Sequence, residues 1–388
     1  MLDPFPLQPL LMPALAILAA TAIATYAVTK AATLSLVTGA IKAAIFISYF
    51  GYFFDGTYTV LDDWTYVRNG IFLLNHNVNF LNFYDNWHIA REASEGNDVF
   101  FYYLYNAFAF ELFGQAQYFA PVALNLVLVA LIAYLGYRLA HTEFGIEALP
   151  AKIFFFFLLF HPDILVWSNL LNIKDIFVLL THVLLLTAIA NIFKGKLLIA
   201  TLIIAVILPI LVLTRYYVIV LFAIALILSL AVFSRTARIS AIAISSGLLI
   251  AIYLWFGMEA FLGPIRIIQQ TFVNPIYGAI RFLLTPIPFN TDPEYTFLNL
   301  PAVLHWLFAP FLLVGVVKVW QLGTNYSRFF IIYFLTYIVV FSIVGEIQGP
   351  RQRVQLDFAI ALFQFTGIMA AYTAIKFRPN RSNSLGST

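Results

Sequence analysis

The main pattern in the sequence is a series of long apolar runs separated by short polar stretches. A helix that crosses the hydrocarbon core of a bilayer needs about 20 mostly apolar residues. Runs of this kind occur at 9–29, 32–54, 119–139, 151–167, 174–193, 197–214, 216–233, 239–257, 302–320, 328–345 and 356–376. Lys42 and the stretch His161-Pro162-Asp163 interrupt two of these eleven runs, so ten spans would also fit. The pattern predicts an all-α, polytopic bundle of transmembrane helices.

The composition agrees with a membrane protein. Of the 388 residues, 62% are hydrophobic and only 10% are charged, whereas soluble domains carry about 25% charged residues. The formal charge of +3 is small, and we therefore expect no nucleic-acid partner. The chain has no cysteine, so a metal ion would have to bind carboxylates, histidine or a substrate phosphate.

The positions of the basic residues predict which end of the bundle faces the cytoplasm, because Lys and Arg favour cytoplasmic loops. Alternation of the runs places 13 of the 21 basic residues inside: Lys30, Lys42, Arg138, Lys152, Lys194, Lys196, Arg235, Arg238, Lys318, Arg328, Lys376, Arg378 and Arg381. Only Glu143 and Glu147 of the 18 acidic residues join them. Residues 1–376 then form a single transmembrane domain, followed by a short basic cytoplasmic tail at 377–388.

Two longer segments, about 55–118 and about 258–301, fall outside on this topology. Residues 98–111 are rich in Phe and Tyr and predict a helix that lies in the membrane interface. The second segment contains Pro264, Pro275, Pro286, Pro288 and Pro293, which predict a broken loop along the membrane instead of a pair of helices. We find no internal repeat, whereas transporters built from inverted repeats show internal symmetry.

An acidic pair, Asp62-Asp63, lies in the first outer segment and is followed by Tyr66. Two adjacent carboxylates near a low-dielectric surface can titrate separately, which suits one of them to act as a general base or a metal ligand. The pair would equally suit a helix N-terminus, where Asp is favoured by the helix dipole. The spacing leaves both interpretations open.

A second group, His161, Asp163, Lys174 and Asp175, lies at the outer ends of two consecutive runs. Ionisable groups at membrane depth are costly, so they usually face a water-filled cavity or one another. These residues are candidates for orienting an acceptor or a cation. Lys174 and Asp175 would also fit a local ion pair that reaches the interface.

Arginines form the third and fourth groups. Arg215 stands between two apolar runs with almost no loop, and Arg351 and Arg353 follow Glu346 and the turn residues Gly349-Pro350. All three arginines lie outside on the predicted topology, against the usual bias. Because a guanidinium makes a fixed fork for a phosphate or a carboxylate, we predict that Arg215 binds one of these groups. Arg215 would equally fit a turn residue that reaches lipid headgroups. For Arg351 and Arg353 we predict binding of an anionic headgroup, with or without a role in catalysis.

In their order along the chain, these features resemble the glycosyltransferase C superfamily, which includes protein mannosyltransferases and aminoarabinose transferases. Four features carry the resemblance: Asp62-Asp63-Trp-Thr-Tyr66 in place of an Asp-Glu-x-x-Tyr motif, Leu112-Phe113-Gly114 after an interfacial helix, Pro162 with Ser168 and Lys174-Asp175, and Arg351 with Arg353. The resemblance covers about residues 45–235. Asp63 stands where the family usually has Glu.

The resemblance implies a membrane enzyme that transfers a hexose or pentose, with inversion, from a polyprenyl-phosphate donor to an acceptor on the non-cytoplasmic face. Asp62, or as second choice Asp63, would deprotonate the acceptor hydroxyl. Arg215, Arg351 and Arg353 would stabilise the departing lipid phosphate. The acceptor, whether protein, lipid or glycan, and the sugar stay open.

The remaining candidates would orient the acceptor or a divalent cation, Mg²⁺ or Mn²⁺: His161, Asp163, Lys174, Asp175 and Tyr66. We expect such a cation to matter only if Asp163 or Asp175 faces Asp62. The expected location is the bacterial inner (plasma) membrane, with the site on the periplasmic or extracellular face and in contact with membrane lipid. The alternatives are a polysaccharide polymerase or ligase that uses lipid-linked glycans, and a lipid or glycan transporter.

Overall fold

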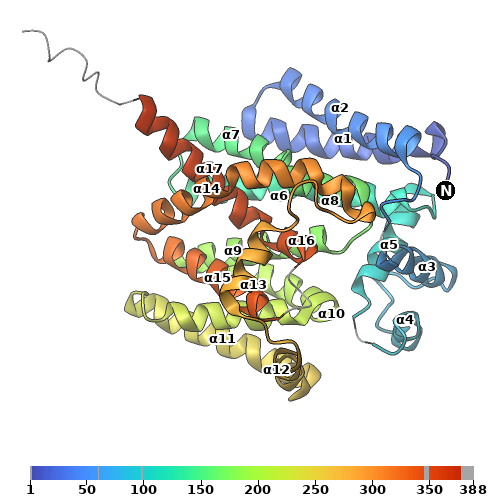
Figure 1. Ribbon diagram of the computed structural model, residues 1–388. Helices are drawn as coiled ribbons and strands as arrows, with labels where there is room; N and C mark the ends of the chain where they lie inside the picture. The colour runs from blue at the N-terminus through green and yellow to red at the C-terminus, as the bar shows by residue number, and fades with distance from the viewer. Residues whose placement is uncertain (1, 60, 98, 345–348, 377–388) are drawn as a thin grey trace, which may run out of the picture.

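The computed structural model describes residues 2–59, 61–97, 99–344 and 349–376. The predicted tail at 377–388 and Glu346 lie outside these ranges. The chain is 80% helical, with no β-strand in the ranges described, which confirms the predicted all-α bundle (Figure 1).

The helices are α1 (Leu7–Thr29), α2 (Ala32–Ser48), α3 (Leu61–Asn75), α4 (Trp87–Ala93), α5 (Phe101–Phe113), α6 (Phe119–Thr142), α7 (Ala148–Leu159), α8 (Pro162–Leu170), α9 (Asp175–Phe193), α10 (Leu197–Ser229), α11 (Arg235–Phe256), α12 (Glu259–Thr271), α13 (Pro275–Leu284), α14 (Asn299–Gln321), α15 (Asn325–Ile343), α16 (Pro350–Arg353) and α17 (Asp357–Lys376). A π-helical turn at Tyr49–Phe53 extends α2, and 3₁₀ turns occur at Pro293–Leu298 and Val354–Leu356.

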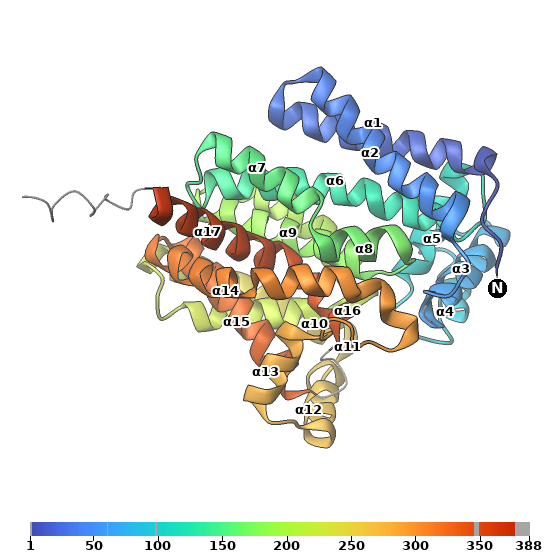
Figure 2. The same cartoon turned by 45° about the horizontal axis from the view of Figure 1, so that its top comes forward.

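The helices form one bundle with a smaller group of helices at one end. In both views α1 and α2 lie side by side along one edge, next to α6 and α7, while α3, α4 and α5 gather at the end near the N-terminus (Figures 1 and 2). Ten helical segments of the described chain are long and apolar enough to cross a membrane. The predicted run 197–214 and most of the run 216–233 fall within one of them, the 33-residue α10.

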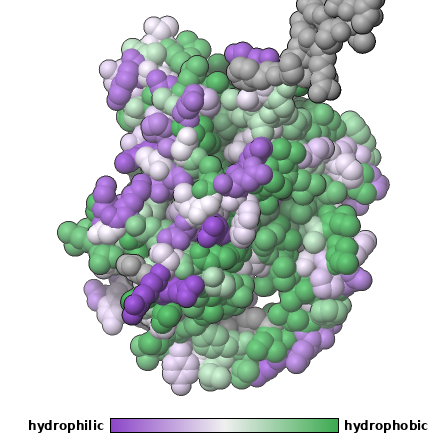
Figure 3. Space-filling model, turned by 90° about the vertical axis from the view of Figure 1, so that its left-hand side faces the viewer, coloured by the Kyte–Doolittle hydropathy of each residue, from purple (hydrophilic) through white to green (hydrophobic). Residues whose placement is uncertain are grey.

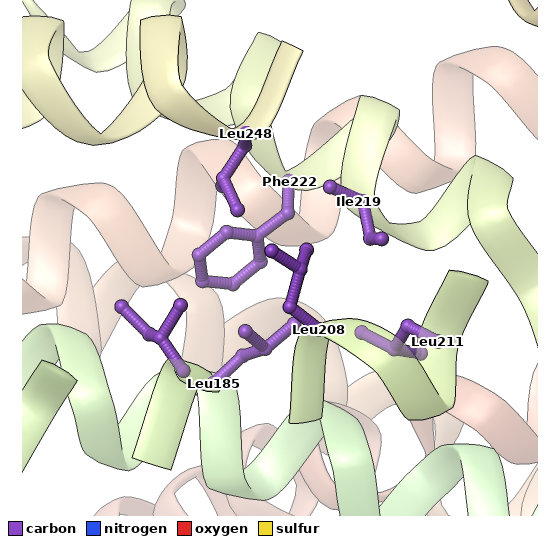
Figure 4. Close-up of a pocket in the computed structure, with 7 residues that line it drawn as sticks. Leu185, Leu208, Leu211, Ile219, Phe222 and Leu248 are labelled. Carbon is purple, nitrogen blue, oxygen red and sulfur yellow. The ribbon is translucent and has the colours of Figure 1, made fainter. Parts of the chain in front are cut away.

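α10 folds back on itself at Arg215, whose φ of −148° and ψ of 69° are not helical. A straight helix of this length would extend for about 50 Å, yet the rings of Phe193 and Phe233, which flank its ends, have centroids 5.2 Å apart. Side chains from both arms line one cavity (Figure 4): Leu208 and Leu211 from the first, Ile219 and Phe222 from the second. α10 therefore consists of two antiparallel arms. If each arm is counted as one pass, the ten candidate segments of the described residues make eleven passes along the bundle, as the eleven apolar runs predict.

Several connections meet at one end of the bundle, which we call the inner end. Lys194, after α9, forms an ion pair with Glu143, after α6. The side chain of Asn325, at the start of α15, accepts a hydrogen bond of 3.3 Å from the backbone N–H of Ser234, after α10. Figure 3 looks onto this end, where hydrophilic residues form patches between hydrophobic areas. The connections that follow α6, α9 and α10 and the one that precedes α15 are thus near one another in pairs. The alternation predicted from the basic residues assigns all four to the same side.

Lys42 is an exception to the predicted inner cluster of basic residues. It lies midway along α2 and is only 1% exposed, with its ammonium 5.3 Å from the ring centroid of Phe160. The prediction that Lys42 belongs to the inner end was wrong, because a lysine eleven residues into a long helix lies about 15 Å along its axis.

The two outer segments are more ordered than predicted. α5 does not lie freely in the interface: it packs between α3 and α6, and Tyr102, Tyr105 and Phe110 on it are buried. The segment after α11 contains two helices, α12 and α13, where a broken loop was predicted. Pro275 begins α13 and Pro286 follows its end, so these prolines bound a helix instead of interrupting one.

α14 and α17 cross at unusually close range. A Cβ atom added to Gly315 would lie 1.8 Å from the carbonyl oxygen of Phe363, and one added to Gly367 would lie 1.9 Å from the carbonyl oxygen of Phe311. Small residues at such a crossing let the two backbones touch. The contact holds α17 against α14, and the segment 350–357, which supplies charged residues described next, leads directly into α17.

Candidate active site

Charged side chains from four separated segments meet at the end of the bundle opposite the inner end. We call the following residues the arginine cluster: Asp62 and Tyr66 on α3, Lys174 and Asp175 at the start of α9, Arg215 at the turn of α10, and Arg351 on α16. Asp62 and Asp175 each occupy the first turn of a helix, where the helix dipole favours a carboxylate. Both interpretations of these acidic residues, helix start and candidate site, therefore apply together.

Arg351 joins two carboxylates that are far apart in the sequence. Its Nε donates to Asp175 Oδ2 at 2.9 Å, and its Nη1 donates to Asp62 Oδ2 at 2.8 Å. Its Nη2 lies 3.5 Å from the hydroxyl of Tyr66. The Arg351 side chain is 21% exposed, so it holds the two acids in place while part of it stays open to a ligand.

Asp175 is the fully buried anchor of the cluster. Besides Arg351, it contacts Arg215 Nη2 at 3.5 Å and accepts a hydrogen bond of 2.8 Å from Gln355 Nε2. The Gln355 carbonyl oxygen in turn accepts a hydrogen bond from Tyr217 at 3.1 Å. A buried carboxylate needs this degree of pairing, because an unpaired charge in a low-dielectric interior is very costly. Asp175 thus fixes two arginines side by side.

The acidic pair separates into two environments. The side chain of Asp62 is 55% exposed and touches Arg351, whereas Asp63 is 0% exposed. Asp63 accepts a 2.6 Å hydrogen bond from the hydroxyl of Tyr118, and burial raises the pKa of Tyr118 well above its ordinary value, so the phenol stays a donor. Only Asp62 is accessible to a substrate.

Asp63 belongs to a buried polar network that ties α3, α5 and α6 to the α8–α9 connection. Asn172 donates its backbone N–H to Tyr118 at 3.1 Å and its side-chain amide to Asn106 at 2.8 Å. Tyr102 donates to the side-chain oxygen of Asn172 at 3.0 Å. Buried polar groups that satisfy one another in this way make a rigid support. Asp63 therefore holds the cluster in position without facing it.

Lys174 adds a cation whose charge depends on pH. Its ammonium lies 5.6 Å from the ring centroid of Tyr66. Burial, and after it the neighbouring Arg215, lowers the pKa of Lys174 to about 7. Burial also raises the pKa of Tyr66, which therefore stays a neutral phenol beside the two acids and three cations.

A second group, which we call the buried cluster, lies where α8, α14 and α17 meet: His161, Asp163, His305, Arg353 and Asp357. Arg353 Nη2 contacts Asp163 Oδ2 at 3.2 Å, and Arg353 also donates to the backbone carbonyls of Leu283, at 3.2 Å, and Thr285. These residues are at most 3% exposed. A ligand that approaches from outside cannot reach them in this conformation.

The structure thus sorts the ten predicted site residues. Six form the arginine cluster, as the sequence led us to expect for Asp62, Arg215 and Arg351. His161, Asp163 and Arg353 belong instead to the buried cluster, and Asp63 to the polar network. The predicted phosphate role of Arg353 does not fit, because its guanidinium is buried against Asp163 and two carbonyls. Asp175 and Asp62 both contact Arg351, so the guanidinium lies between the two carboxylates whose facing was the condition set for a role of a divalent cation.

Sequence reasoning missed Gln355, Asp357 and His305. Asp357 and His305 fall inside apolar runs, and ionisable residues in such runs are candidates for function by their cost alone. That signal was available. No comparable signal marks Gln355, because an uncharged amide next to a helix start is common.

Comparison of the chain with protein-family models, curated proteins and solved structures finds no match. The class defined by fold and site is a polytopic helical membrane protein with a partly exposed acid and arginine site at one end of the bundle.

Proposed function

We propose that the protein is a membrane glycosyltransferase that moves a sugar from a polyprenyl-phosphate donor to an acceptor at the non-cytoplasmic face. The observation that supports this proposal is the pairing of an exposed carboxylate, Asp62, with the partly exposed Arg351 beside Arg215 and Lys174. One acid that can accept a proton and several cations that can bind a phosphate stand together at the membrane end that the charge rule assigns to the outside.

In this reaction the acceptor hydroxyl transfers its proton to Asp62 while its oxygen attacks the anomeric carbon of the sugar. The bond from that carbon to the phosphate oxygen breaks, and the lipid phosphate leaves with the electron pair. Arg215 and Lys174 are placed to stabilise the charge that develops on this phosphate. Arg351 keeps Asp62 oriented through a hydrogen bond of 2.8 Å, and a base held in place in this way contributes about 10²–10⁴ in rate.

Asp175 has a positioning role in this scheme, since it contacts both arginines and is 0% exposed. Two guanidinium groups repel each other at short range, and a carboxylate between them offsets that repulsion. Asp175 thereby holds Arg215 beside the phosphate and Arg351 beside Asp62.

The test uses the purified protein in lipid vesicles with a panel of undecaprenyl-phosphate-linked hexoses and pentoses. Release of undecaprenyl phosphate is measured for the wild type, Asp62→Asn and Arg351→Ala. Two controls match them: Asp85→Asn removes another exposed carboxylate of the same outer segment, and Arg68→Ala removes an exposed arginine of α3. We expect loss of turnover in the first two variants only. Wild-type turnover in both of them would refute the site.

A further inference from the structure

The buried cluster contains polar atoms that lack partners. Both carboxylate oxygens of Asp357 and the Nδ1 atom of His161 find no hydrogen-bond partner among the residues that the structure describes. Asp357 is 0% exposed and His161 is 2% exposed. Since buried polar groups are nearly always paired, these orphan atoms indicate a missing partner.

The spacing of these side chains fits a metal ion. His161, Asp163 and Asp357 each offer one ligand atom, and these atoms lie within 4.8 Å of one another. Two metal–ligand bonds of about 2.0–2.6 Å, depending on the ion, bridge atoms that are up to about 5.2 Å apart, whereas a direct hydrogen bond fails beyond about 3.5 Å. From this geometry we propose that His161, Asp163 and Asp357 bind a divalent metal ion.

The environment of His161 prepares it as a ligand. Its Nε2 lies 3.1 Å from the side-chain oxygen of Gln364, and a carbonyl oxygen only accepts, so the proton belongs on Nε2. The lone pair is then on Nδ1, the unpartnered atom. Histidine ligands usually donate their second ring N–H to an oxygen in this way, which fixes the ring and raises its basicity.

His305 adjoins the site without being one of its three ligands. Its Nε2 lies 2.6 Å from the Leu283 carbonyl oxygen, so Nε2 carries the proton and Nδ1 the lone pair of a neutral ring. That Nδ1 lies 3.5 Å from Asp163 Oδ2, and Arg353 Nη2 lies 3.2 Å from the same oxygen. Arg353 therefore supplies the positive charge beside Asp163, but the Asp357 oxygens and His161 Nδ1 still lack a partner among the described residues. The ion supplies one.

The ligand set indicates which ion binds. Imidazole favours transition metals, while carboxylates accept harder ions, and Zn²⁺ and Mn²⁺ are divalent ions that accept both. The ion would tie the α7–α8 junction to the first residue of α17. This is a structural role at a place that the proposed transfer reaction does not use, so the inference does not depend on that reaction.

The test begins with the metal content of the wild-type protein, purified in detergent without added metal or chelator and measured by inductively coupled plasma mass spectrometry. We expect about one ion of zinc or manganese per chain, because the site has three protein ligands and a buried environment. Stripping with a chelator should lower the thermal unfolding temperature, and adding back Zn²⁺ or Mn²⁺ should restore it. Wild-type protein with background metal and no thermal response to either ion would overturn the proposal.

Variants locate the ion. Asp357→Asn and His161→Gln should lose it, and Gln364→Leu should weaken its binding by about 10–100-fold, since it removes only the support of His161. Asp85→Asn and His76→Gln, which change exposed side chains, should retain it. If Asp357→Asn and His161→Gln fold and keep a full ion, the site lies elsewhere and the proposal fails. Where neither variant folds, the Gln364→Leu affinity decides: an unchanged value contradicts the site.

Discussion

The two carboxylates of the acidic pair should respond in opposite ways to replacement by asparagine. Asp62→Asn changes an exposed side chain whose partner, Arg351, keeps a second carboxylate at 2.9 Å. Asp63→Asn changes a buried acceptor in the support network. The first variant should lose turnover without losing stability, and the second should lose stability first.

The expected sizes follow from burial. An exposed ion pair contributes about 0–1 kcal/mol to stability, so Asp62→Asn should unfold at nearly the wild-type temperature. Its turnover should fall about 10²–10⁴-fold if it is the base. The 2.6 Å bond from Tyr118 to Asp63 is charge-assisted, and a neutral acceptor makes a bond about half as strong. Asp63→Asn should therefore lose about 1–2 kcal/mol of stability.

Two measurements on the same preparations separate these effects: thermal unfolding in detergent, and release of undecaprenyl phosphate per folded chain in vesicles. Asp85→Asn controls for the loss of an outer carboxylate. If Asp63→Asn folds with wild-type stability but does not turn over, while Asp62→Asn turns over normally, the roles of the two residues are reversed and the reasoning from burial is wrong.

Three further predictions test other parts of the structure. The pKa of Lys174 is lowered to about 7 by burial, so Lys174 loses its charge near this pH and the donor KM should rise as pH increases through about 7. Lys174→Arg should flatten this rise. An unchanged pH profile in the variant would exclude Lys174 from the phosphate site. Arg215→Lys should raise the donor KM about tenfold, since it loses about one charge-assisted hydrogen bond; an equal KM would remove Arg215 from the phosphate site. Gly315→Ala should lower the free energy of unfolding by about 1–3 kcal/mol, because its Cβ would lie 1.8 Å from a backbone carbonyl oxygen. Gly247→Ala is the control, since its Cβ would meet nothing within 4 Å. Equal unfolding temperatures of the two variants would refute the close crossing.

The spans could be predicted from sequence because the cost of a polar backbone in lipid forces each apolar run into a helix. The turn at Arg215 could be predicted for the same reason, because this single arginine separates two apolar runs that are each long enough to cross a bilayer. The outer segments were harder, since the aromatic residues of α5 suit either an interface or a protein core. Tertiary packing of α5 between α3 and α6 decided between them.

The site could be predicted only in part. Sequence proximity suggested that Asp163 and Asp175 act together, and that Arg351 and Arg353 do as well. The structure separates both pairs. Asp163 and Asp175 lie on different helices, α8 and α9, and Arg351 and Arg353 are two residues apart on α16, so their side chains point in different directions. Their true partners, such as Arg351 with Asp62, are hundreds of residues away. No rule of spacing in one chain supplies such contacts.

The short segment 350–357 contributes residues to both clusters and so connects them. Arg351 and Gln355, four residues apart, contact Asp175 of the arginine cluster. Arg353 and Asp357, also four residues apart, belong to the buried cluster. If the segment moves as a rigid unit, a shift of its residues in one cluster also shifts its residues in the other. Binding at the two clusters is then coupled in both directions. If a ligand of one cluster changes the affinity of the other cluster for its ligand, that second ligand changes the affinity of the first by the same factor.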